Sequence, residues 1–266
     1  MADRPTNKKC LLRRHLRASA ASPESMYMGS DWGLETLVLS PDGQKVYRTP
    51  DDAACVALQV GEGERVLWVV SSATALVRLG GGSVRINVFP DASTALPKLD
   101  LELFHFFGRV NMYVNLVPRA NLVLDPAYLQ RFYRSLPPSR GPAWHELYLE
   151  CADDAALAPF QTRSADIRTL AGQTALFYSA DGTLENTRLM ADYARRAALL
   201  WLDLRSAAVH DKPTSEEHRR LEAYNAEHLG FVRKDPDNSK VGDLVGANAL
   251  EEMLRLSSRD PRILVR

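Results

Sequence analysis

The side chain in this sequence best suited to chemistry is Glu102, a carboxylate inside an otherwise apolar, alternating run. Side chains alternate between the two faces of a strand. One face is predicted to carry Asp100, Glu102, Phe104 and Phe106, and the other Leu99, Leu101, Leu103, His105 and Phe107. Burying a carboxylate beside aromatic rings is costly unless it is paired, and such burial favours the protonated acid, a potential proton donor. The alternative is that Glu102 lies on the solvent-facing side of an edge strand.

A second alternating run follows directly in the chain and predicts another strand. Its faces carry Asn111, Tyr113 and Asn115 on one side, and Met112, Val114 and Leu116 on the other. His105 is on the opposite strand face from Glu102. We therefore expect His105 to be a satisfied core histidine rather than a catalyst.

The elements that must position these residues begin with short strands. Residues 34–50 predict a hairpin with a PDG turn between its strands. Further strands are predicted at 56–60, 65–70 and 83–89, and the GGG at 80–82 is expected to form a flexible turn.

After this region the apolar period changes from that of strands to that of helices. Asp125 is a predicted N-cap with Pro126 in the first turn, which starts a helix over 125–136. The remaining predictions are helices at 143–160, 185–208, 214–230 and 249–257 and a late strand at 174–180. In the longest helix, Leu189, Tyr193, Ala197 and Leu200 fall on one face. The helix at 214–230 has a capping-box start and a terminal glycine.

Strands followed by helices predict an α+β fold, in which helices flank a central antiparallel β-sheet. We expect one domain over residues 29–266. Residues 1–28 are rich in basic and small residues and contain no acid between Asp3 and Glu24. This composition is typical of a disordered, transit-like segment.

Composition excludes several functional classes. Lys plus Arg and Asp plus Glu number 33 each, so no bulk charge points to nucleic acid. The three cysteines, Cys10, Cys55 and Cys151, form no CxxC pair or metal-ligand cluster, so no metal site is expected. No apolar run approaches the length of a membrane span, so an integral membrane protein is not expected.

Standard cofactor motifs are also absent from the sequence. It contains no GxGxxG after a strand, no GxxxxGK[ST] and no GxSxG. An enzyme of this kind is expected to act through acids and positioned side chains on a substrate that brings its own chemistry.

Three stretches of the sequence share a family pattern. They are the spaced residues Leu116, Pro118, Arg119, Leu122, Leu124, Pro126, Tyr128, Arg131 and Tyr133, then TRSA at Thr162 to Ala165, and then Trp201, Leu202 and Asp203. In these stretches the sequence resembles the red chlorophyll catabolite reductases of plants. In that alignment Glu102 stands at the position of the family's catalytic glutamate. Asn115 stands where the reductase pattern has Asp.

The wider ferredoxin-dependent bilin reductases are similar in the same regions. The matching residues are Phe89, Pro90, Asp91, Pro97 and Glu102, then Lys234, Asp235 and Pro236. Arg85 falls near the position where several bilin reductases carry a catalytic histidine. A second catalytic aspartate of the family corresponds to Asp243 in one alignment and to Asp235 in the other, and we favour Asp243 slightly.

The resemblance implies an α/β/α sandwich that reduces a linear tetrapyrrole with electrons from reduced ferredoxin and no bound cofactor. Glu102 would donate a proton, and the substrate would be bound by Arg163, Asn115, Phe104 and Arg85. Arg163 would pair with substrate propionates, whereas for Arg119 a surface or intramolecular salt bridge is favoured. Ferredoxin would dock on basic residues, with Arg195, Arg196, Arg219 and Arg220 as candidates. The chloroplast stroma is the expected compartment. A homodimer is one candidate assembly.

Three functions follow from this comparison. The leading prediction is an oxidoreductase of chlorophyll catabolism, converting red chlorophyll catabolite to a primary fluorescent catabolite. The second is a bilin reductase acting on biliverdin or a related bilin. The third is a non-catalytic tetrapyrrole-binding protein.

Overall fold

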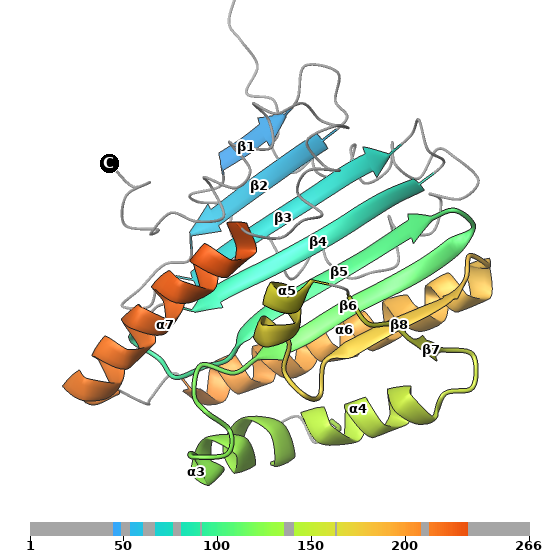
Figure 1. Ribbon diagram of the computed structural model, residues 1–266. Coiled ribbons are helices and arrows are strands. Elements are labelled where there is room, and N and C mark those ends of the chain that lie inside the picture. The colour runs from blue at the N-terminus through green and yellow to red at the C-terminus, as the bar shows by residue number, and fades with distance from the viewer. Residues whose placement is uncertain are drawn as a thin grey trace, which may run out of the picture.

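An eight-stranded antiparallel sheet is the centre of the computed structural model, which describes residues 45–48, 54–60, 67–76, 81–90, 92–135, 141–162, 164–208 and 213–233 (Figure 1). Its strands are β1 Lys45–Arg48, β2 Ala54–Val60, β3 Leu67–Leu76, β4 Gly81–Pro90, β5 Lys98–Phe106, β6 Arg109–Val117, β7 Ala158–Pro159 and β8 Leu176–Asp181. Their order is β1-β2-β3-β4-β5-β6-β8-β7. The order follows the chain up to β6, so the sheet is largely a meander of neighbouring strands.

Helices lie on both faces of this sheet. They are α3 Pro126–Leu129, continued by a π-helical turn at Gln130–Arg134, then α4 Trp144–Asp153, α5 Ala165–Leu170, α6 Leu184–Ala208 and α7 Ser215–Arg233. Figure 1 shows α6 behind the sheet and α5 and α7 in front of it. The predicted α+β sandwich with a central antiparallel sheet is confirmed. None of the described helices is long and apolar enough to cross a bilayer.

The core lies between one face of the sheet and α6, with α4 beside it. Leu101 and Leu103 of β5 and Met112 and Val114 of β6 are at most 1% exposed, as the alternation predicts. α6 packs across β5 and β6. Its Trp201 is fully buried, and the indole Nε1 donates to the Pro97 carbonyl at 2.8 Å. Helix and sheet are thus joined at the residue that precedes β5.

Two helix starts follow their sequence signals. The Asp125 carboxylate accepts a hydrogen bond from the Tyr128 amide at 2.9 Å. At the start of α7, the Thr214 hydroxyl accepts from the Glu217 amide at 3.2 Å, and the Thr214 amide donates to the Glu217 carboxylate at 2.7 Å. Each side chain satisfies a backbone donor that the helix leaves unpaired, so both predicted caps are confirmed.

Three predicted boundaries are wrong. Gly81 and Gly82 are not a turn, because they pair in β4 with the residues that end β3. The helix predicted over 143–160 ends at Asp153, where the next residue, Asp154, has extended backbone geometry. Pro159, inside the predicted helix, belongs to β7. The last described helix runs through Gly230 to Arg233.

One helix, α5, has no counterpart among the predictions. It is short, and its N-cap is Ser164, whose hydroxyl accepts from the Ile167 amide at 3.2 Å. The strand predicted at 34–40 and the helix predicted at 249–257 lie outside the described residues.

Candidate active site

The face of the sheet opposite α6 is polar, and its residues form rows across the strands. Register pairing places Arg85, Glu102, Tyr113 and Phe177 side by side on β4, β5, β6 and β8. A neighbouring row holds Asn87, Asp100 and Asn115. Successive rows are two residues, or about 7 Å, apart along a strand. The face that carries Glu102 therefore concentrates ionisable and amide side chains in the middle of the sheet.

Glu102 is paired with Arg85 on the adjacent strand. Arg85 Nε and Nη2 both donate to Glu102 Oε2, at 3.0 and 2.6 Å. The Glu102 side chain is 20% exposed and that of Arg85 is 41% exposed. Within the described part of the chain, no hydrogen bond to the other oxygen, Oε1, is formed.

This pairing corrects both interpretations of Glu102. β5 is hydrogen-bonded to β4 and β6, so it is an interior strand rather than an edge. The predicted apolar environment is also wrong, because the Arg85 guanidinium contacts the carboxylate. The alternation of β5 contains no information about this cation, which comes from 17 residues earlier in the chain.

A second ion pair, missed by the sequence analysis, lies one row away on the same strand. Lys98 Nζ lies 2.7 Å from Asp100 Oδ1 and 3.0 Å from Oδ2. The lysine side chain is only 5% exposed, whereas that of Asp100 is 29% exposed. Burial lowers the pKa of the Lys98 ammonium, while the charge of Asp100 opposes that shift. Positions 98, 100 and 102 share one strand face, and this periodicity was the signal available in the sequence.

Aromatic rings border the row that contains Glu102. Tyr113, its direct neighbour on β6, stacks on Phe177 with ring centroids 3.7 Å apart, and Phe160 approaches the Tyr113 edge at 5.9 Å. Phe104 is half-buried on the same face as Glu102. Flat, half-buried rings beside polar groups suit a planar conjugated ligand.

One of the front helices, α7, approaches the polar face near the row of Asp100. Burial raises the pKa of Tyr224, on α7, to about 12, and the Asp100 carboxylate adds to that rise. Asn225 on the same helix donates to the Pro90 carbonyl at 3.4 Å. Asp100 therefore lies at the junction of the sheet and α7.

Asn115, a predicted substrate-binding residue, is buried on this face. Its Oδ1 accepts a hydrogen bond from the Gly172 amide at 3.2 Å, which ties β6 to the loop after α5. A Cβ at Gly172 would come within 3.3 Å of that oxygen. The contact gives Asn115 a role in holding the loop, whatever else it binds.

Arg119 is held by hydrogen bonds to backbone carbonyls. Arg119 is buried, and its Nη1 donates to the carbonyls of Thr94 and Leu96 at 2.7 and 3.2 Å. Arg119 therefore braces the segment that leads into β5.

His105 is buried, at 8% exposed, which agrees with the predicted core position. Its Nδ1 has no hydrogen-bond partner among the described residues, which differs from the prediction that the ring is satisfied.

The structure brings Glu102, Arg85, Phe104 and Asn115 together on one face of the sheet. The other predicted site residues, Arg163, Asp235 and Asp243, lie outside the described residues. Across the described ranges, no group of three His, Cys, Asp or Glu residues could hold a metal ion.

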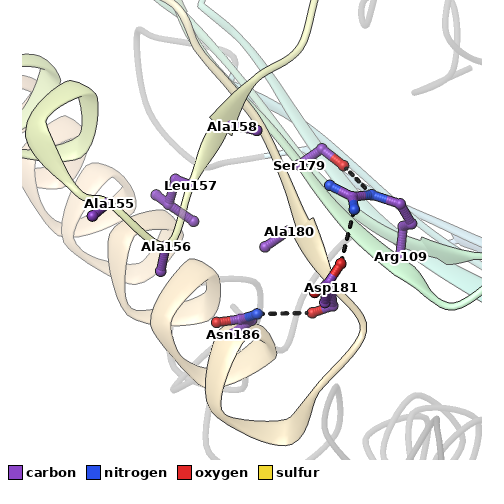
Figure 2. A pocket seen from close by; sticks show the side chains of 9 residues that line it. All are labelled: Arg109, Ala155, Ala156, Leu157, Ala158, Ser179, Ala180, Asp181 and Asn186. Carbon is purple, nitrogen blue, oxygen red and sulfur yellow. Dashed lines mark hydrogen bonds and ion pairs between the residues drawn. The ribbon is translucent and has the colours of Figure 1, made fainter.

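A separate groove of about 400 Å³ lies at the β7–β8 end of the sheet (Figure 2). It is lined by Arg109, Ala155, Ala156, Leu157, Ala158, Ser179, Ala180, Asp181 and Asn186. Arg109 donates there to Ser179 and Asp181 at 3.0 and 2.9 Å. Glu102 is not among the described residues that line this groove.

Comparisons with known proteins identify the fold. No protein-family model and no curated protein matches the sequence. Among solved structures, the chain is similar to phytochromobilin synthase from tomato in complex with biliverdin. The TM-score is 0.65 over 94% of this chain and 82% of the tomato chain, at 13% identity. The two proteins share a fold. The likeness to phytochromobilin synthase confirms the predicted sandwich and concerns the architecture alone.

Proposed function

We propose that this protein is a ferredoxin-dependent reductase of a linear tetrapyrrole. The observation that carries the proposal is Glu102, which Arg85 holds through one carboxylate oxygen in the centre of the polar face and whose side chain is 20% exposed. Phytochromobilin synthase, a ferredoxin-dependent bilin reductase with the same fold, supports it because that protein was solved with biliverdin.

The reaction class suits these residues. A conjugated tetrapyrrole that accepts one electron becomes more basic and takes a proton from a nearby acid. The protein then needs to bind the pigment, orient it and deliver protons. Tyr113 and Phe177 offer a stacked aromatic border, and Glu102 Oε1 can accept a pyrrole N–H or, once protonated, donate to the pigment.

Two substrates remain candidates within this class. Red chlorophyll catabolite is favoured by the sequence motifs, since a glutamate rather than an aspartate stands at position 102. Biliverdin or a related bilin is favoured at least as well by the likeness to a biliverdin-bound protein. As further parts of the proposal, reduced ferredoxin supplies the electrons, no cofactor is bound, and the basic N-terminal segment directs the chain to the chloroplast stroma.

The deciding experiment is an anaerobic assay with reduced ferredoxin and either pigment, followed by absorbance and product chromatography. Reduction of the chlorophyll catabolite alone supports the first substrate, and reduction of biliverdin alone supports the second. Binding of both pigments with reduction of neither contradicts the enzyme proposal and supports a carrier. Absence of binding contradicts the whole proposal.

A further inference from the structure

The polar face holds two carboxylate–cation pairs on β5, and their cations differ chemically. Glu102 is paired with Arg85, and Asp100 is paired with Lys98. A guanidinium keeps its proton throughout the accessible pH range, whereas an ammonium can release it, most readily when buried. Of these two pairs, only Lys98–Asp100 can pass on a proton from its cation.

The two side chains of the Lys98–Asp100 pair differ in their exposure to solvent. Lys98 is almost completely enclosed, while Asp100 is nearly one-third exposed on the same face as Glu102. Asp100 is about 7 Å from Glu102 along the strand, a distance that the rings of one flat ligand can span. The carboxylate therefore stands between the buried ammonium and the site.

Among the described residues, ionisable groups near the pair come from β4, from α7 and from the segment after β6. Arg85 on β4 lowers the pKa of Lys98 in addition to the larger effect of burial. Tyr224 on α7 feels the charge of Asp100, and Arg119, after β6, in turn lowers the pKa of Tyr224. A second cation beside an enclosed ammonium makes release of its proton easier.

We propose that Asp100 is a second proton donor of the site and that Lys98 is the positioning residue that restores its proton. This inference rests on the proposed reductase function. It adds a second acid to Glu102 from within the described sheet, independently of the C-terminal aspartates suggested by the resemblance.

At rest the pair consists of an Asp100 carboxylate and a Lys98 ammonium. Reduced ferredoxin transfers an electron to the tetrapyrrole. The Lys98 ammonium passes a proton to Asp100 as its N–H bond breaks, and the reduced pigment takes that proton from the Asp100 oxygen. Lys98 is left as a neutral amine and Asp100 as a carboxylate, and solvent returns a proton to the pair through the exposed side of Asp100.

The test compares Lys98→Arg, Lys98→Met and Asp100→Asn with the wild-type protein. Lys98→Arg keeps the positive charge but cannot release a proton. Arg109→Gln is the matched control, since Arg109 forms an ion pair with Asp181 at the far end of the same sheet. Initial rates are measured across pH at saturating pigment and ferredoxin, pigment affinity by absorbance titration, and folding by urea denaturation.

We expect Lys98→Arg and Asp100→Asn to lower the maximal rate by about 100-fold, with pigment affinity nearly unchanged. Lys98→Arg should also change the alkaline limb of the rate–pH profile, a readout that a purely structural lysine would not affect. A folded Lys98→Arg variant with the wild-type rate and pH profile would overturn the inference. If Lys98→Arg does not fold, Asp100→Asn decides in the same way.

Failure of the proposed function can be told apart from failure of this inference. If the wild-type protein reduces no tetrapyrrole, the function is wrong, and the pair is then judged by NMR titration of the Lys98 side-chain nitrogen. We expect it to titrate below ordinary surface lysines, and lower still in Asp100→Asn. Titration together with the surface lysines would overturn the inference regardless of turnover.

Discussion

Glu102 owes its chemistry to a partner on another strand. Arg85 on β4 donates two hydrogen bonds to one carboxylate oxygen, Oε2, and the other oxygen accepts none from a described residue. In the proposed reaction this second oxygen accepts an N–H of the pigment, or donates once it has taken up a proton.

Replacement of this residue separates an enzyme from a carrier. In Glu102→Gln the side chain keeps its shape but has no carboxyl proton, so turnover should fall by about 100-fold or more. Pigment affinity should change little. Both are measured by anaerobic assay and absorbance titration. Asp181→Asn, which alters an exposed ion-paired carboxylate on the same sheet, is the control and should leave turnover intact. Normal turnover in Glu102→Gln would remove this residue from the mechanism.

At the scale of elements, the turn that enters α6 packs tightly against the β5–β6 turn. The Gly182 amide donates to the Gly108 carbonyl at 2.7 Å. A Cβ at Gly182 would meet the His105 ring and come within 2.8 Å of that carbonyl oxygen. At Gly108, by contrast, nothing lies within 4 Å, but φ is 73°.

Alanine at these two glycines should therefore destabilise the fold for different reasons. Gly182→Ala should cost about 3 kcal/mol because backbone must move. Gly108→Ala should cost about 1–2 kcal/mol from left-handed backbone geometry alone. Urea denaturation of both variants checks the order. A smaller loss at Gly182 would show that the two turns separate easily.

The α6 helix is tied to the start of β5 through Trp201. Trp201→Phe removes the donor to the Pro97 carbonyl and leaves that buried oxygen unpaired, which should cost about 1–3 kcal/mol. Leu199→Ala on the same helix is the control, because Leu199 is 44% exposed and its truncation should cost less than about 0.5 kcal/mol. Equal losses in denaturant titrations would contradict this account of the anchor.

The helix faces also bear on the predicted ferredoxin surface. Arg195 is paired with Asp192, Arg196 with Glu150 and Arg219 with Glu216. Each of these three arginines thus has an acidic partner on its own or a neighbouring helix. The docking of ferredoxin on the basic residues stays a prediction.

For the whole molecule, buried protonated groups predict a loss of stability in alkali. Burial raises the pKa of Cys151 from 9.0 to about 12 and that of Tyr224 from 10.0 to about 12. The folded state then holds more protons than the unfolded state, so this contribution is complete below the ordinary pKa values and is lost as pH rises toward 12. Lys98 changes the stability in the opposite direction. Its pKa is lowered in the folded state, so its contribution to the unfolding free energy increases as pH rises toward 10.5.

The unfolding free energy should therefore fall between about pH 9 and about pH 12, since Tyr128 and Tyr133 add to the same effect. Urea midpoints at several pH values measure it. Cys151→Ala should be less stable at neutral pH but should lose less stability in alkali than wild type. A midpoint that rises through this range would mean that Lys98 outweighs the thiol and phenols.

Local chemistry was enough to predict much of the architecture. The two-residue alternation in β5 and β6 correctly separated Leu101 and Met112 from Glu102 and Tyr113. Caps at Asp125 and Thr214 marked two helix starts. The boundaries failed where tertiary pairing decided them, as at Gly81 and Gly82, whose place in β4 depends on how far β3 extends.

The sequence by itself determined which side chains share the polar face, because strand periodicity is a property of the local backbone. Only the tertiary structure decided the partners of those side chains. Arg85 reaches Glu102 through the register of β4 on β5, and Tyr224 comes within electrostatic range of Asp100 through the docking of α7. Charge state and proton supply depend on such non-local contacts and on burial, which a one-dimensional pattern does not contain.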